Sequence, residues 1–256
     1  MTLDAERIDQ PVEDPVSNVL KWVLLVVAIV TFGLLAWATT VTYRTAPPQP
    51  NRFTAPDGRV LMTADDLLAG KGGFQKADLM DYGSLYGMGS YYGEDYTASI
   101  LVRLGTATQN NVAIARFGKS FTGLSADQQA SAATTMRGIL QGVDLTKVDV
   151  ILPAPLAQAV DAVRDEVAKS LNVANPAAGW TPAYSLTPAL ARQTADFLVF
   201  SSLTTVARRP GLTWSWTENW PYEPLVGNTP TTNTFRWTWI SFCFTFFAFG
   251  LVIFIY

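Results

Sequence analysis

The sequence predicts a mainly α-helical membrane protein, in which two transmembrane helices flank one mostly helical domain that carries a short β-hairpin. Two long apolar segments lead to this prediction. Trp22 to Tyr43 and Trp237 to Tyr256 contain no Asp, Glu, Lys, Arg or His, and each has about the 20 residues needed to cross a hydrocarbon layer of roughly 30 Å. Between them, apolar residues recur at helical spacing, and one Asp-Gly turn near the start indicates a hairpin.

These segments divide the chain into four regions. We expect a cytoplasmic N-terminal tail over residues 1–19, a first transmembrane helix over 20–43, an extracytoplasmic domain over 44–234 and a second transmembrane helix over 235–256. The first apolar run is too long, and its leader too acidic, for a typical cleaved signal peptide. Buried core helices are the alternative, which such a length without charge disfavours. The few Lys and Arg residues beside the spans do not decide the orientation.

The domain between the spans is expected to consist of one hairpin and five helices. The hairpin joins residues 52–54 to residues 59–62 around an Asp-Gly turn. Thr63 and Ser125 are good N-cap residues, each followed by a helical pattern. The predicted helices cover residues 64–78, 97–117, 126–140, 155–171 and 186–208. Pro210 and Gly211 are expected to end the last of them.

The composition excludes several kinds of chemistry. The chain has no histidine, and its single cysteine, Cys243, lies inside the second apolar segment. Ser-His-Asp and Cys-His catalysis, histidine-ligated zinc and histidine-ligated haem are therefore excluded within this chain, as is an intrachain disulfide. A net charge of −3 gives no basic surface for nucleic acid. Neither apolar segment holds a carboxylate that would relay protons.

Two aromatic blocks stand out in the domain. Residues 82–96 hold five of the nine tyrosines and four glycines, which predicts an ordered, tightly wrapped loop rather than a linker. Residues 212–234 form a loop rich in Trp and Pro. Its tryptophans are expected to lie at the membrane interface, to seal a joint with a partner, or to do both.

These blocks resemble the N-terminal region of quinol-dependent nitric oxide reductases. Gly83-Ser84-Leu85-Tyr86-Gly87-Met88-Gly89-Ser90-Tyr91 with Asp95-Tyr96-Thr97-Ala98 is similar to the family pattern G-S-I-W-G-H-G-S-Y-x-x-x-D-W-S-A. Asn219 to Asn228 reads N-W-P-Y-E-P-L-V-G-N, against N-W-P-x-E-P-L-V-G-N in the family. The blocks occur in the right order, each beside the right apolar segment, and the resemblance is weakest across about residues 105–195.

The resemblance implies a cytochrome c-like domain that has lost its haem. In the related cytochrome c subunit, a C-x-x-C-H motif attaches the haem. The two cysteine positions hold Leu79 and Tyr82 here, and the histidine position holds Gly83. Because an empty cavity is costly, Tyr82 and Tyr86 are expected to fill the vacated volume.

The resemblance also implies contacts with a partner. In the cytochrome-containing relatives this loop helps to hold a calcium at the catalytic subunit. Carried over, the calcium ligands are the Gly89 carbonyl and Tyr91, and the alternative is an ordinary buried tyrosine. The remaining residues expected at the partner interface come from both blocks: Tyr86, Gly87, Met88, Tyr92, Trp220, Pro221, Glu223 and Pro224.

The function implied is that of a non-catalytic N-terminal part, or separate subunit, of a quinol-dependent nitric oxide reductase. The complete enzyme reduces two NO to N2O with electrons from quinol, in denitrification or NO detoxification. We expect no catalytic residue and no cofactor in this chain alone, because the histidine ligands are missing. Haem b, non-haem iron, the quinol and the calcium would belong with a haem-copper-type catalytic membrane subunit. The expected location is the bacterial inner membrane, with the domain in the periplasm.

Two other functions remain open. The chain would serve equally as a structural or assembly subunit of a different haem-copper oxidase-like complex. It would also serve as a two-span sensor with an extracytoplasmic ligand domain, although no cytoplasmic output domain is recognisable in the sequence.

Overall fold

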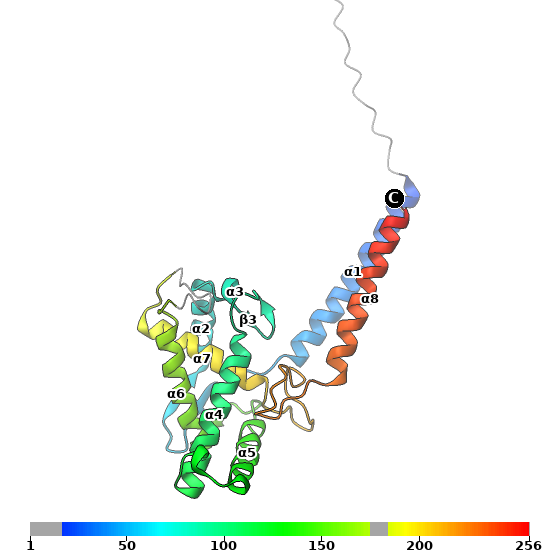
Figure 1. The fold of residues 1–256 in the computed structure, drawn as a ribbon. Helices are drawn as coiled ribbons and strands as arrows, with labels where there is room; N and C mark the ends of the chain where they lie inside the picture. Colours follow the sequence, from blue (N-terminus) through cyan, green and yellow to red (C-terminus); the bar gives the residue numbers. More distant parts are fainter. Residues whose placement is uncertain (1–16, 175–183, 256) are drawn as a thin grey trace, which may run out of the picture. The chain divides into compact units, whose positions relative to one another are not determined.

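The computed structural model describes residues 17–174 and 184–255, and the chain forms two compact units, residues 1–46 and 47–256. Helix α1 (Asn18–Thr45) is the described part of the first unit (Figure 1). Its first turn is capped by Ser17, whose Oγ accepts a hydrogen bond from the Leu20 amide at 3.2 Å. None of its side chains is buried, which suits a helix whose surroundings are lipid.

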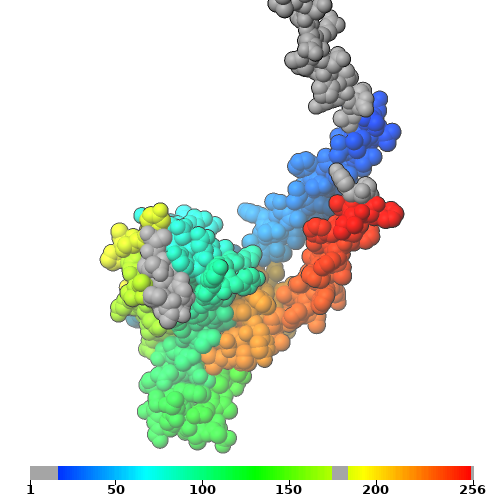
Figure 2. Space-filling model, turned by 45° about the horizontal axis from the view of Figure 1, so that its top comes forward, coloured from blue at the N-terminus to red at the C-terminus, as the bar shows by residue number. Residues whose placement is uncertain are grey.

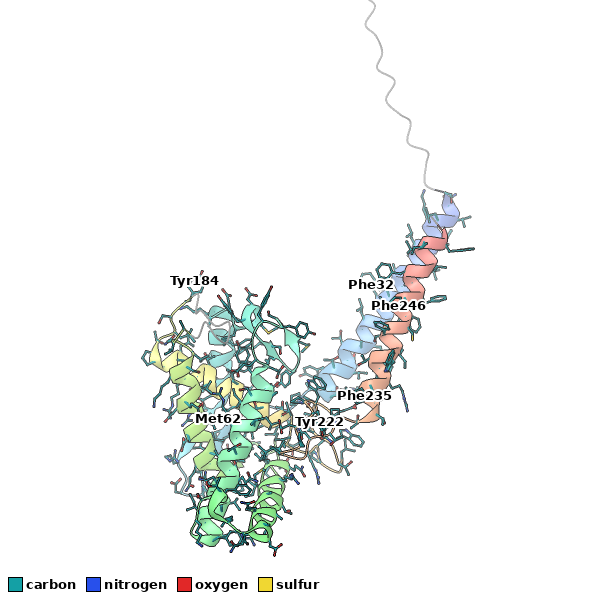
Figure 3. The ribbon with its side chains drawn as sticks, in the orientation of Figure 1. Phe32, Met62, Tyr184, Tyr222, Phe235 and Phe246 are labelled. Atoms are coloured by element: carbon teal, nitrogen blue, oxygen red, sulfur yellow. The ribbon has the colours of Figure 1, made fainter. Side chains whose placement is uncertain are left out.

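The second unit ends in another apolar helix, α8 (Thr232–Ile255). Both α1 and α8 are long and apolar enough to cross a membrane, and no part of their apolar windows is buried. Phe32 on α1 and Phe246 on α8 each project outward from their own helix (Figure 3). The two predicted spans are thus confirmed as candidate spans, each a few residues longer than the apolar run itself.

A three-stranded sheet opens the second unit. Strands β1 (Arg52–Thr54) and β2 (Val60–Thr63) pair antiparallel, with Gly58 in the left-handed region at φ 85°, and this confirms the predicted hairpin. Strand β5 (Asp149–Ile151) lies parallel to β1 on its other edge, so the sheet order is β2-β1-β5. Strand β5 was not among the elements predicted from the sequence.

The five predicted helices are all present. They are α2 (Ala64–Lys76), α4 (Tyr96–Phe117), α5 (Ala126–Gln141), α6 (Ala154–Ser170) and α7 (Pro188–Thr204), with a short α3 (Leu79–Tyr82) and a 3-10 turn (Phe121–Gly123) between them. Thr63 and Ser125 are the predicted N-caps of α2 and α5, and each also forms a capping box with the residue three positions on.

Helices α2, α4, α6 and α7 pack around the main core (Figure 1). Glycine allows α2 to approach α7 closely, because a Cβ added at Gly70 would lie 1.9 Å from the carbonyl oxygen of Gln193. The Phe74 ring then packs edge-on against Tyr96 and tilted against Phe197. Met62 of β2 is fully buried on the same core (Figure 3). This packing fixes the start of α4, on which the site described below is built.

A buried ion network crosses the core. Arg164 on α6 donates to Asp161 Oδ1 at 2.5 Å, to Asp196 Oδ1 at 3.3 Å and to the Leu61 carbonyl. Burial raises the pKa of Asp196 to about 7, although the neighbouring Arg164 guanidinium opposes this rise. Asp161 therefore serves as the main counterion of Arg164.

Helix α7 ends at Thr204, four residues before its predicted end at Arg208. The helix ends here because the backbone groups that would continue its hydrogen-bond pattern bond to residues outside the helix. The Arg208 amide donates to the Gln141 carbonyl on α5 at 3.1 Å, and the Trp216 amide donates back to the Thr204 carbonyl at 3.2 Å. This turn starts the loop of residues 205–231, called the Trp/Pro loop below.

Candidate functional site

The first aromatic block, residues 82–96, contains a two-stranded hairpin. Strands β3 (Ser84–Leu85) and β4 (Met88–Gly89) pair antiparallel around Tyr86 and Gly87, which have φ values of 57° and 74°. Positive φ at both central residues is the requirement of the tight hairpin turns that match strand twist. The wrapped loop predicted from the sequence is thus an ordered hairpin, called the Tyr hairpin below.

Asp95 ties the Tyr hairpin to helix α4. Its Oδ2 accepts hydrogen bonds from Ser84 Oγ and from the Gly87 amide, both at 2.6 Å. Its Oδ1 accepts from Thr97 Oγ1 and, at 2.9 Å, from the Ala98 amide, which makes Asp95 the N-cap of α4. Partial burial disfavours the charged carboxylate, yet these hydrogen bonds outweigh it and hold the pKa of Asp95 below its ordinary value. One carboxylate therefore fixes both the helix start and the hairpin.

The outer side of the Tyr hairpin is apolar and exposed. Met88 is 64 % exposed, Tyr91 94 % and Tyr92 88 %. Tyr86 differs, because its ring turns inward and its hydroxyl lies 3.0 Å from Thr204 Oγ1 on α7. Met88, Tyr91 and Tyr92 thus form an exposed group of side chains on a rigid support, while Tyr86 belongs to that support.

The Trp/Pro loop meets the hairpin at its turn. A Cβ added at Gly87 would lie 3.3 Å from Cζ2 and Nε1 of Trp220, so the indole ring covers this glycine. Trp220 itself remains 37 % exposed. Gly87 and Trp220 are 133 positions apart in the sequence, and their contact joins the two blocks into one continuous surface.

Side chains of α5 and of the loop itself hold the Trp/Pro loop in place. Arg137 donates from Nε to the Leu225 carbonyl at 2.9 Å and from Nη2 to the Pro224 carbonyl at 3.0 Å. Buried Asn228 donates to the Thr205 carbonyl at 2.8 Å. In the space-filling view the orange loop lies against the green helical part (Figure 2). Because its carbonyls are bonded to side chains of the domain, the loop is a built part of the fold.

The same loop is bonded to the first turn of α8. Glu218 Oε1 accepts from Asn233 Nδ2 at 3.0 Å, and Glu218 Oε2 accepts from Thr231 Oγ1 and, at 3.4 Å, from Thr234 Oγ1. Burial opposes ionisation of Glu218, but these three donors hold its pKa below the ordinary value. The surface made by the Tyr hairpin and the Trp/Pro loop thus adjoins the start of a candidate membrane span.

Predicted interface residues of the second block have different surroundings. Pro221 is buried, and Glu223 uses Oε1 to accept from the Leu225 amide at 3.0 Å within its own turn. Pro224 is exposed, and so is the neighbouring Tyr222, which projects from the loop (Figure 3). Pro221 and Glu223 therefore shape the loop, while Tyr222, Pro224 and Trp220 present surface.

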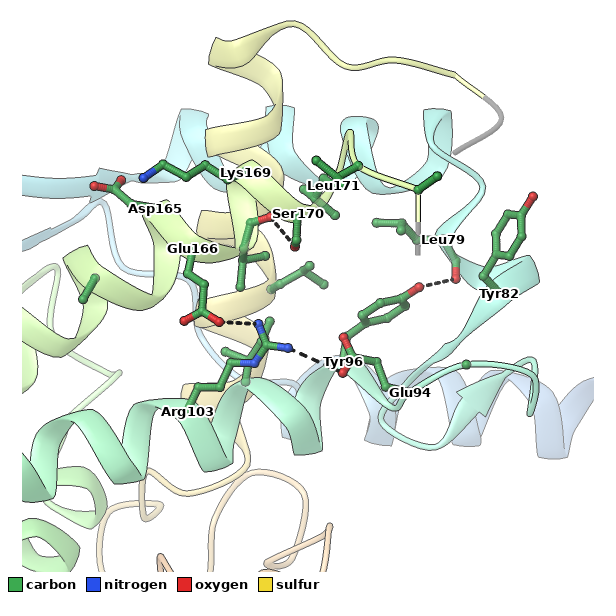
Figure 4. A pocket seen from close by; sticks show the side chains of 17 residues that line it. Leu79, Tyr82, Glu94, Tyr96, Arg103, Asp165, Glu166, Lys169, Ser170 and Leu171 are labelled. Atoms are coloured by element: carbon green, nitrogen blue, oxygen red, sulfur yellow. Dashed lines mark hydrogen bonds and ion pairs between the residues drawn. The ribbon is translucent and has the colours of Figure 1, made fainter. Parts of the chain in front are cut away.

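The positions aligned with haem attachment do not fit a covalent haem. Leu79 is buried, Tyr82 is half-buried and neither carries a thiol. At Gly83 a Cβ would lie 2.5 Å from the Glu94 carbonyl oxygen and 2.8 Å from the Tyr96 ring, so a histidine there would displace backbone. Leu79 and Tyr82 line a cavity of about 840 Å³, whereas Tyr86 is not among its described lining residues (Figure 4). Tyr82 forms part of a wall of this cavity and Tyr86 turns toward α7. That these two rings fill the volume of a lost haem stays a prediction.

Comparison with protein families gives one match. Residues 50–222, more than half of the chain, match the family described as the cytochrome c-like domain of the nitric oxide reductase protein NorB. The chain belongs to this family. No curated protein matches it. The family match extends from the start of the β1 hairpin to Trp220–Tyr222, so it includes both the Tyr hairpin and the ring that covers Gly87.

The predicted calcium ligands of this nitric oxide reductase domain lie at the edge of the Tyr hairpin. Gly89 has a φ of 135°, and a Cβ there would lie 2.5 Å from the Gly83 carbonyl oxygen, so only glycine fits. Tyr91 is almost fully exposed. The described residues contain no group of three acidic, histidine or cysteine side chains that would hold a metal. Any calcium at Gly89 and Tyr91 would need most of its ligands from elsewhere.

The residue that organises this site, Asp95, was not predicted from the sequence to do so. Asp95 appears in the family-like motif, but its role as cap and hairpin tie was not assigned. The sequence Asp95-Tyr96-Thr97-Ala98 could have indicated the cap, because an Asp directly before a helix accepts a hydrogen bond from the amide three positions on. The contact of Gly87 with Trp220 leaves no such trace in the sequence.

Proposed function

We propose that this chain is the non-catalytic part of a quinol-dependent nitric oxide reductase that is anchored in the membrane and covers the catalytic subunit. The family match over residues 50–222 carries the proposal. The surface of the Tyr hairpin and Trp/Pro loop supports it, because exposed Met and Tyr side chains on a rigid, membrane-adjacent support are typical of an interface.

The complete enzyme would convert two NO, two electrons and two protons into N2O and water, with quinol giving up the electrons and protons as it becomes quinone. Haem b and non-haem iron in the partner subunit would carry out this chemistry. Residues of this chain would take no part in electron transfer, since its sequence supplies neither thiols nor imidazoles for a haem in the domain. Their contribution would be to cover the partner and hold it in place.

Two finer points belong to the same proposal. The Gly89 carbonyl and Tyr91 would complete a calcium site whose other ligands come from the partner, since calcium prefers oxygen ligands. The domain between α1 and α8 would lie in the periplasm of a bacterium, with both apolar helices in the inner membrane. The second point accords with two apolar helices on either side of one folded domain.

The proposal is tested by purifying the tagged full-length chain from its native membrane in mild detergent. The optical spectrum should show haem b bands from a co-purifying protein, and the preparation should consume NO when quinol is supplied. Tyr91→Glu combined with Tyr92→Glu places two charges on the exposed face and should lower the co-purifying haem at least tenfold. Leu68→Glu is the control for a charge placed on an exposed apolar side chain elsewhere, because Leu68 is 69 % exposed on α2.

The possible results separate the alternatives. A haem-free chain without a partner would refute the proposal and favour the two-span sensor. A partner that reduces oxygen but not NO would identify an oxidase-like complex instead. Equal haem recovery from the double variant and from the Leu68→Glu control would show that the partner binds at a different surface.

A further inference from the structure

We propose that the cavity between α3, α4 and α6 is a binding site for an uncharged, largely apolar small molecule. Its volume is about 840 Å³, within the range of roughly 300 to 1,000 Å³ that is usual for small-molecule sites. It lies within one unit of the chain, and its lining residues come from four separate segments (Figure 4). This site is independent of the surface to which a catalytic partner is assigned.

The inner walls of the cavity are apolar. Ile100 and Leu198 are buried side chains of α4 and α7, and Val167 and Leu171 bring the end of α6 to the opposite wall. Tyr96 adds an aromatic ring beside them. Water in contact with such walls is unfavourable, and an apolar ligand that displaces it gains the free energy of apolar transfer.

A buried polar group that lines the cavity, the Tyr96 hydroxyl, is already bonded. The Tyr96 hydroxyl donates to the Leu79 carbonyl at 3.2 Å. Burial raises the pKa of Tyr96, so the hydroxyl stays protonated and does not act as a metal ligand. The described lining residues include no His, Cys or Met. The cavity therefore recognises its ligand by shape and apolar contact, without an iron–ligand bond.

Four of the five charged residues that line the cavity form ion pairs, and Lys169 forms none with the described residues. Arg103 lies 3.3 Å from Glu166 Oε1 and 3.7 Å from Glu94 Oε2 (Figure 4). Asp165 pairs with Arg192 at 3.1 Å. A ligand that carried a charge would have to compete with these pairs, whereas an uncharged ligand would pass between them. This arrangement is the reason for assigning an uncharged ligand.

The test uses the full-length chain in lipid nanodiscs and N-phenyl-1-naphthylamine, an uncharged apolar probe that fluoresces in apolar surroundings. After subtraction of empty nanodiscs, the wild-type chain should show saturable binding with one site per chain. Ala162→Trp fills the cavity from an exposed position on α6 and should weaken that binding at least tenfold. Ala115→Trp is the matched control, an exposed alanine on α4 outside the cavity, and should bind as the wild type does.

A second pair keeps the test decisive if Ala162→Trp does not fold, as judged by circular dichroism. Val173→Trp fills the cavity from a loop position that is 61 % exposed, and Val148→Trp is its control at a loop position 66 % exposed outside it. Absence of saturable binding, or equal binding by cavity and control variants, would overturn the proposal. Tighter binding of the anionic probe 8-anilinonaphthalene-1-sulfonate than of the neutral probe would overturn the assignment of an uncharged ligand.

Discussion

Removing the Asp95 carboxylate should destabilise the domain by about 3 kcal/mol. Asp95→Ala removes an N-cap, which costs about 1 kcal/mol. It also leaves the hydroxyls of Ser84 and Thr97 without their acceptor, and both residues are buried. Each unsatisfied hydroxyl costs at least about 1 kcal/mol. The Gly87 amide adds little, because that residue is exposed and its N–H is solvated once released.

Ser125→Ala provides the matched control. Ser125 caps α5 in the same manner, accepting from the Gln128 amide at 3.4 Å, but it holds no hairpin. Its replacement should cost only about 1 kcal/mol. Urea unfolding of the full-length chain in nanodiscs, followed by tryptophan fluorescence, measures both variants. Hydrogen exchange of residues 83–90 should rise in Asp95→Ala alone.

The same carboxylate predicts a pH dependence. Its pKa is lowered in the folded state, so its stabilising effect is complete above the ordinary Asp pKa of about 3.9 and is lost as pH falls below that value. The stability difference between wild type and Asp95→Ala should therefore shrink in acid. An Asp95→Ala chain that is no less stable than Ser125→Ala, with unchanged exchange at residues 83–90, would refute the reasoning.

Three further predictions concern the core and the Trp/Pro loop. Gly70→Ala should destabilise the domain by at least about 2 kcal/mol in urea unfolding, because the new Cβ would overlap the α7 backbone. Gly72→Ala is the control on the same helix, where a Cβ would meet open space, and it should raise the stability by up to about 1 kcal/mol. Asp196 has a raised pKa, so its contribution to stability is full below about pH 4 and declines as pH rises toward about 7; Asp196→Asn should abolish that decline in a pH series of unfolding curves. Arg137→Ala should increase proteolysis and hydrogen exchange of residues 220–228, since two carbonyls of the loop lose their donor; unchanged protection there would contradict the role assigned to Arg137.

The helices were predictable because their information is local. Thr63 and Ser125 mark helix starts through side chains that bond three residues away, and both form the expected N-caps, each within a capping box. The early end of α7 was not predictable from Pro210 and Gly211. The helix stops at Thr204 because the Arg208 amide finds the Gln141 carbonyl, a partner 67 positions away that no local pattern reveals.

The residues of the site could be predicted from the sequence, but the contacts between them could not. The motifs point to Gly87 and Trp220 separately, yet only the fold shows that the indole ring covers the glycine. The sequence shows that thiols and imidazoles are missing near Gly83. It does not show that the space at Gly83 is closed by the Glu94 carbonyl, nor that a cavity persists beside Leu79. Steric closure depends on backbone positions, which sequence patterns do not carry.

The parallel pairing of β1 with β5 has a consequence for biosynthesis. Arg52 and Asp149, which pair across these strands, are 97 positions apart, so at about 5–20 residues per second the ribosome makes β5 roughly 5 to 20 s after β1. During that interval one edge of β1 is open. The face of α2 that carries Gly70 and Gly73 stays unpacked for longer, because α7 is made later still. An open strand edge invites pairing with another chain. Because Val226 belongs to the core, the domain completes its core only after that residue has been made. A chaperone that shields the N-terminal hairpin until then would raise the yield of folded protein.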